Sequence, residues 1–210
     1  MCTVPERLAP RWPGVGILLA MGLCATSWIA AAPNSSPWVD TVATLTAALE
    51  TLERDMPDAD YANRFDVLAP IIRDTHDLDT MARLALGRTA DDLTEPQRHD
   101  FDRLFVELTI ASYATRFQDL GSGFEIRNDT PARGGRYSVE AELAPADRAP
   151  IRLDYLLHER DDRWLIINVL AEGVSDLALK RSQFAALFAE RGFVGLRESL
   201  RAEIDTLRTD

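Results

Sequence analysis

The chain has 210 residues, of which 46% are hydrophobic, and its formal net charge is −11 at pH 7. Its acidic excess and its single lysine, Lys180, exclude a nucleic-acid surface, because phosphate binding requires clustered lysine and arginine side chains. The two cysteines, Cys2 and Cys24, both lie near the start, which excludes thiol catalysis, thiolate metal sites and disulfides from residues 25–210.

Residues 1–32 have the three parts of a secretory signal peptide. Two arginines precede an apolar run over residues 15–29, and small residues follow at 30–32. The run is short and contains glycine, whereas a membrane anchor needs about 20 mostly apolar residues, so we favour cleavage over a retained anchor. A lipid-modified Cys24 is disfavoured because Leu23, which is not small, precedes it. We therefore expect a mature domain over residues 33–210 with a net charge of −12.

Four segments before position 120 carry apolar residues at helical spacing. The clearest start is at Thr94, which with Gln97 three residues later forms a capping-box pattern. Ser36 followed by Pro37 is a second start signal, and Gly87 is a typical helix end. The pattern predicts helices over residues 37–55, 61–74, 78–86 and 95–117.

The spacing of apolar residues then changes from helical to alternating, which is typical of strands. The strands expected from this pattern are 124–126, 137–143, 151–158 and 164–170, and the turns between them are short. Short turns favour an antiparallel meander. Two more helices are expected over residues 175–191 and 193–207, separated at Gly192. The sequence thus predicts a single α+β domain with a curved four-stranded antiparallel sheet covered by about six helices from both ends of the chain.

Recognisable catalytic motifs are missing from the chain. The histidines, His76, His99 and His158, fall in a turn or on the polar side of an expected element, so we expect them on the solvent surface. Asp154 and Asp176 lie near the sheet, but the alternation places Asp154 on the outer face, which disfavours a role as a general base. The apolar stripes leave two alternatives open: a filled core, or an apolar cavity between sheet and helices.

The residues also carry a family resemblance. The stretches 172–175 and 181–184 and the pairs at 192–193 and 195–196 resemble the C-terminal signature of the MlaC family, the periplasmic lipid-binding components of a lipid-transport system. The segments 61–70, 81–87 and 108–117 fit the same pattern. Residues 178–181 and 113–117 resemble more closely the HpnM subgroup, which is associated with hopanoid lipids. Two positions depart from the family pattern: Asn168 replaces an aspartate, and Lys180 replaces a tyrosine.

The resemblance implies a periplasmic lipid carrier with no enzymatic activity and no cofactor or metal. It would enclose the tails of a phospholipid or hopanoid and pass the lipid between an inner-membrane transporter and an outer-membrane acceptor by transient docking. From the inward-facing strand positions and helix stripes, the expected tail contacts are Phe65, Leu68, Met81, Leu84, Phe105, Leu108, Val139, Leu153, Tyr155 and Ile166.

Two other functions stay open at this point. A small isomerase or dehydratase on a similar scaffold predicts a buried acid or histidine inside the pocket. An envelope assembly factor predicts a filled core and a large exposed apolar patch.

Overall fold

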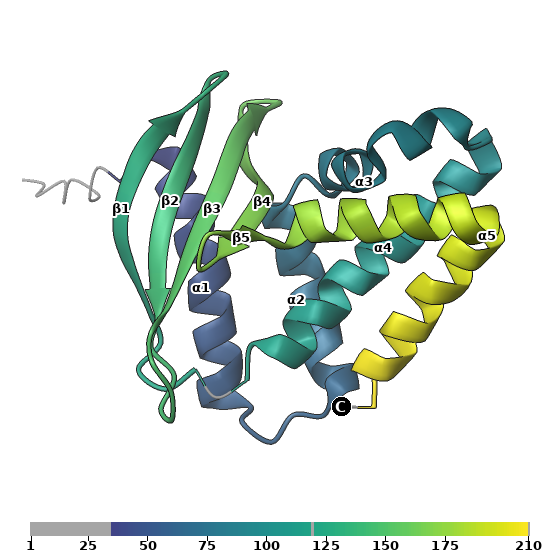
Figure 1. Cartoon of the computed structure of the whole chain (residues 1–210). Helices are drawn as coiled ribbons and strands as arrows, with labels where there is room; N and C mark the ends of the chain where they lie inside the picture. Colours follow the sequence, from purple (N-terminus) through teal and green to yellow (C-terminus); the bar gives the residue numbers. More distant parts are fainter. Residues whose placement is uncertain (1–34, 119, 210) are drawn as a thin grey trace, which may run out of the picture. The chain divides into compact units, whose positions relative to one another are not determined.

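A computed structural model describes residues 35–118 and 120–209, so the expected signal peptide at residues 1–32 lies outside the described residues. Helices occupy both ends of this part of the chain, and an antiparallel sheet lies between them in the sequence (Figure 1). The first helices are α1 (Pro37–Asp55), α2 (Tyr61–Thr75), α3 (Leu78–Leu86), a 3-10 turn η1 (Gly87–Asp92) and α4 (Glu95–Arg116). The last helix is α5 (Asp176–Leu207). The expected α+β single domain is confirmed.

The sheet is a meander in which each strand pairs with the next one along the chain. Its strands are β1 (Phe124–Ala132), β2 (Arg136–Leu143), β3 (Ile151–Arg160), β4 (Arg163–Ala171) and β5 (Val174–Ser175), in that order across the sheet. Tyr155 in β3 lies between Val139 of β2 and Val169 of β4, and this row faces the helices. The prediction of four strands missed β5, because two residues are too few to show an alternating pattern.

Helix α1 packs on the inner face of the sheet, as Figure 1 shows. Its stripe of Val42, Leu45, Leu49 and Leu52 is buried, which is the spacing of one helix face. The Thr41 hydroxyl at the start of this helix donates to the carbonyl oxygen of Trp164 in β4, at 2.8 Å. Helix α1 thereby joins the sheet to the rest of the helical layer.

Helix α4 lies in the middle of the helical layer and contacts α2, α3 and α5. The capping-box prediction is confirmed at its start, where the Thr94 amide donates to Oε1 of Gln97 at 3.0 Å. At its end, the buried Arg64 side chain donates to the carbonyl oxygens of Ala114 and Phe117, at 2.8 and 2.6 Å. These carbonyls have no partner within the helix, so Arg64 satisfies acceptors that the core would otherwise leave unpaired.

Helix α5 is bent back on itself, so that its second half returns beside α4 (Figure 1). The bend is at Gly192, whose φ of 62° and ψ of −166° are not helical. The sequence predicted two separate helices divided at this glycine. The break in helical geometry lies at that glycine, as predicted. Because the two halves count as one element across the break, the described residues have five α-helices rather than six.

Candidate functional site

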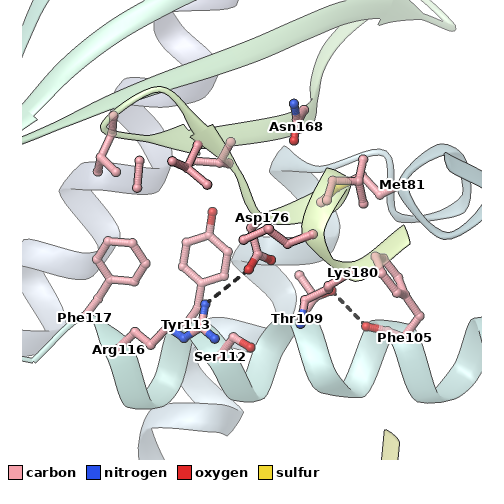
Figure 2. A pocket seen from close by; sticks show the side chains of 16 residues that line it. Met81, Phe105, Thr109, Ser112, Tyr113, Arg116, Phe117, Asn168, Asp176 and Lys180 are labelled. Carbon is pink, nitrogen blue, oxygen red and sulfur yellow. Dashed lines mark hydrogen bonds and ion pairs between the residues drawn. The ribbon is translucent and has the colours of Figure 1, made fainter. Parts of the chain in front are cut away.

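A pocket of about 300 Å³ lies between the β4–β5 end of the sheet and the helices α3, α4 and α5 (Figure 2). Most of its wall is apolar, and the residues that form this part are Met81, Phe105, Tyr113, Phe117, Leu153, Val169, Ala171, Val174, Leu177 and Leu179. The wall draws on both halves of the sequence, because α4 supplies one side and the chain from β3 to α5 supplies the other. Concave, largely apolar sites of this size bind small apolar ligands or parts of larger ones.

Two hydroxyl groups on the α4 side of the pocket are engaged by their own helix. Thr109 donates to the carbonyl oxygen of Phe105 and Ser112 to that of Leu108, each at 2.8 Å. Such backbone bonds satisfy the hydroxyl within the helix. The pocket wall is therefore less polar than its residue types suggest.

Asn168 and Ser175 hold the start of α5 against β4. The Ser175 hydroxyl donates to Oδ1 of Asn168 at 2.9 Å and accepts from the Ala178 amide at 3.0 Å, which caps the helix. Asn168 is one of the two departures from the family pattern, and it borders the pocket.

Lys180, the second departure, also borders the pocket. Its side chain is buried, and Nζ lies 3.2 Å from Oε1 of Glu203 in the second half of α5. The charge is thus neutralised within the helix hairpin that α5 forms.

The opening of the pocket carries an ion pair between the end of α4 and the start of α5. One guanidinium nitrogen of Arg116 lies 3.6 Å from a carboxylate oxygen of Asp176, and both side chains are about half exposed. Figure 2 shows this contact as a dashed line beside Tyr113. The sequence singled out Asp176 as near the sheet, and it lies at the opening rather than inside the pocket.

A buried polar cluster lies behind Tyr113. His76 is 3% exposed, so its expected place on the solvent surface is wrong. The Thr75 hydroxyl donates to the carbonyl oxygen of Ile71, so its oxygen accepts from Nδ1 of His76, at 2.9 Å. Nε2 of the neutral ring then accepts from the Tyr113 hydroxyl at 3.0 Å. Burial lowers the pKa of His76 to about 4 and raises the pKa of Tyr113 well above its ordinary value.

Asp77 connects α3 to the far end of β3. Its carboxylate accepts from the Thr80 amide at 2.9 Å, from His158 Nε2 at 2.8 Å and from Arg160 at 2.8 Å. Burial opposes ionisation of Asp77, but these hydrogen bonds outweigh it, and the pKa of the carboxyl is lowered. His158 is partly buried, with its ring hydrogen-bonded to Asp77, which the surface expectation missed, whereas His99 is exposed as predicted.

The predicted tail contacts fall into three groups. Met81, Phe105 and Leu153 line the pocket. Leu68, Leu108, Val139, Tyr155 and Ile166 are fully buried in the core, and Phe65 is partly buried against it. Leu84 lies on the outer side of α3 and is 39% exposed.

Sequence reasoning did not select several residues that line the pocket: Phe117, Val169, Leu177 and Leu179. Phe117 and Leu177 were visible in the apolar stripes of their helices. Val169 gave no directional signal, because its strand is apolar on both faces in the sequence.

Residues 35–118 and 120–209 show neither a metal site nor a membrane-spanning helix. No group of three histidine, cysteine or acidic side chains is arranged there to hold a metal ion. No helix of this part of the chain is long and apolar enough to cross a bilayer.

A known protein structure shares this architecture. A similar fold occurs in the solved structure of a phospholipid-binding protein from Ralstonia solanacearum in complex with a phospholipid. The TM-score is 0.71 at 20% sequence identity, over 82% of this chain and 99% of that one. A comparison with curated proteins gives no match. The MlaC protein family matches residues 42–202, more than three quarters of the sequence, and the chain therefore belongs to the MlaC family.

Proposed function

We propose that this protein is a lipid carrier that shields lipid tails from water in the pocket between the sheet and α3, α4 and α5. The observation that carries the proposal is the apolar wall of that pocket, in a chain of the MlaC family. The phospholipid-binding protein from Ralstonia solanacearum, whose fold is similar, supports the same class of ligand.

The free-energy cost of exposing lipid tails to water explains why a carrier is required. Each methylene group exposed to water costs about 0.8 kcal/mol, so a lipid with two long tails scarcely leaves a membrane unaided. Binding to an apolar wall removes this cost without any covalent step. The polar headgroup stays at the opening, where Arg116 and Asp176 lie.

The size of the pocket bears on how tails are enclosed. Its volume of about 300 Å³ is at the lower end of the range for drug-sized ligands. Two full-length tails therefore require the core beside the pocket to open. The predicted contacts that lie in the core, among them Leu68, Leu108 and Tyr155, would meet a tail only in this wider state.

The wider role follows from the same proposal. We infer that the chain is exported after removal of residues 1–32 and moves lipid across the periplasm between an inner-membrane transporter and an outer-membrane acceptor. Its acidic composition supports brief contact with membranes, because anionic lipid surfaces repel it. The cargo is a glycerophospholipid or a hopanoid, and lipid extraction distinguishes the two.

The first test is native mass spectrometry of the protein purified from its own envelope, followed by extraction and identification of bound lipid. The proposal predicts a stoichiometric lipid. A protein that carries none and takes none from vesicles would contradict it and favour an assembly factor.

A matched pair of variants tests the position of the tails. Met81 lines the pocket, and Leu84 lies one turn further along α3 on the outer side. Met81→Glu places a charge in the apolar wall and is expected to reduce lipid uptake at least tenfold, because the carboxylate would be desolvated by a tail. Leu84→Glu adds the same charge at an exposed position and is expected to leave uptake unchanged.

A second pocket variant covers the case in which Met81→Glu does not fold. Ser112→Trp fills the space next to α4 from a half-buried position. If Ser112→Trp folds and takes up as much lipid as the wild type, the tails bind outside this pocket.

A further inference from the structure

The opening of the pocket carries one positive and one negative side chain that make few bonds within the protein. Of the three charged residues that line the pocket, Lys180 is paired with Glu203, which leaves Arg116 and Asp176. Their closest atoms are 3.6 Å apart, beyond hydrogen-bond distance. Within the described residues, neither side chain takes part in a hydrogen bond. Both therefore keep their donors and acceptors available at the point where a headgroup would lie.

The two side chains are complementary to the two charges of a zwitterionic headgroup. Arginine presents a planar set of N–H donors that matches a phosphate, and a carboxylate accepts hydrogen bonds from a primary ammonium. An exposed ion pair of this kind contributes little to stability, so its exchange for ligand contacts costs the fold little.

The charge of the whole chain adds to this selection. The formal net charge is −11, so an anionic headgroup approaches a protein of its own sign. A headgroup with no net charge avoids this repulsion and still offers a phosphate to Arg116.

We propose that Arg116 and Asp176 select zwitterionic aminophospholipids, with Arg116 binding the phosphate and Asp176 the primary ammonium. This inference rests on the proposed lipid-carrier function. On binding, the contact between Arg116 and Asp176 is exchanged for one contact from each side chain to the headgroup.

The test is competition between two headgroups on identical tails. The protein is incubated at low salt, where exposed charges are least screened, with vesicles of equimolar phosphatidylethanolamine and phosphatidylglycerol. The lipid bound to the recovered protein is quantified by mass spectrometry. The wild type is expected to favour phosphatidylethanolamine about two- to fivefold, the range that an exposed charged contact provides.

Helix α5, which begins with Asp176, also contains a matched control pair. Arg191 and Glu198 form an exposed ion pair at 2.7 Å, and neither residue lines the pocket. Asp176→Asn is expected to abolish the preference, whereas Glu198→Gln makes the same change in net charge and is expected to keep it. Arg116→Gln is expected to reduce uptake of both lipids, since both carry the phosphate, and Arg191→Gln is expected to reduce neither.

The outcomes separate the two proposals. Equal uptake of both lipids by the wild type, or a preference that survives in Asp176→Asn, would overturn the headgroup assignment while leaving the carrier function intact. Failure to take up either lipid, by a wild type that also carries no lipid when purified from its own envelope, would contradict the carrier function itself.

Discussion

The buried histidine beside the pocket makes the stability of the fold sensitive to mild acid. His76 is neutral in the folded protein down to its pKa of about 4, because burial disfavours the charged ring. In the unfolded chain the same ring takes up a proton below about pH 6.5. The unfolded state thus binds more protons between these two values, and the fold loses free energy as the pH falls through them.

We expect the free energy of unfolding to fall by about 2 kcal/mol between pH 7 and pH 5 from this residue alone. Denaturant titrations at several pH values measure it. In His76→Gln, the free energy of unfolding should not show this decrease between pH 7 and pH 5. In His99→Gln, whose side chain is exposed, the decrease should remain. Asp77 contributes in a different pH range. Its lowered carboxyl pKa stabilises the fold above the ordinary value of 3.8, and this contribution is lost only as the pH falls below that value. If His76→Gln loses as much free energy of unfolding between pH 7 and pH 5 as the wild type, the pH dependence comes from other groups.

Gly121 is a second residue whose identity the fold requires. Its φ is +61°, and a Cβ atom there would lie 2.3 Å from the carbonyl oxygen of Ala144. Gly134 has a similar φ of +73° but nothing within 4 Å. Only the first position combines backbone strain with a clash against main chain.

Gly121→Ala is therefore expected to lower the free energy of unfolding by about 3 kcal/mol or more, from strain and overpacking together. Gly134→Ala is expected to cost about 1–2 kcal/mol, the cost of the left-handed conformation. Thermal or urea unfolding of the two variants measures the difference. Equal losses would show that the loop at residue 121 moves aside without cost.

At the scale of elements, α5 is positioned by its first residues. The Ser175 side chain caps the helix and also bonds to Asn168 in β4, so one hydroxyl fixes both the start of the helix and its place on the sheet. Ser36 precedes α1 in the equivalent position but makes no capping bond with its side chain.

Ser175→Ala is expected to lower the free energy of unfolding by about 1 kcal/mol, the usual value of a cap. Ser36→Ala is expected to change it by less than about 0.5 kcal/mol, as at ordinary surface sites. Chemical denaturation compares the two, and similar losses would mean that neither the cap nor the bond to Asn168 stabilises the fold. Asn168→Asp keeps an acceptor for Ser175 and is expected to preserve the cap.

The sequence predicted these elements well because their signals are local. Thr94 and Gln97 marked the start of α4, and the change from helical to alternating spacing marked the sheet. The burial of His76 was missed because it depends on a distant strand: the Asp77 amide donates to the carbonyl oxygen of Ile166 at 3.0 Å, some ninety positions along the chain.

The pocket was only partly predictable for a related reason. Periodicity indicates which side of an element is buried, but the space left between buried sides depends on how neighbouring helices pack. Phe105 and Leu108 share one stripe of α4, yet only Phe105 borders the pocket. Whether an inward residue meets a ligand or a neighbour is a property of the tertiary arrangement.

At the scale of the molecule, the pairing of the strands and the packing of α5 on α4 differ in how far apart the contacting residues lie in sequence. The strands are joined by short turns, so their pairing is local. The return of α5 to α4 is not, because Thr115 bonds to the carbonyl oxygen of Leu207 across 92 positions.

This difference in contact range favours one order of assembly. Local pairings close short loops at little entropic cost, whereas docking of the final segment must bring together residues about ninety positions apart. We expect the meander to form early and α5 to join it last, so the pocket is complete only at the end of folding. A folding chain in which α5 has not yet docked would expose the sides of α3, α4 and β4 that α5 covers, and in that interval it is most prone to aggregation.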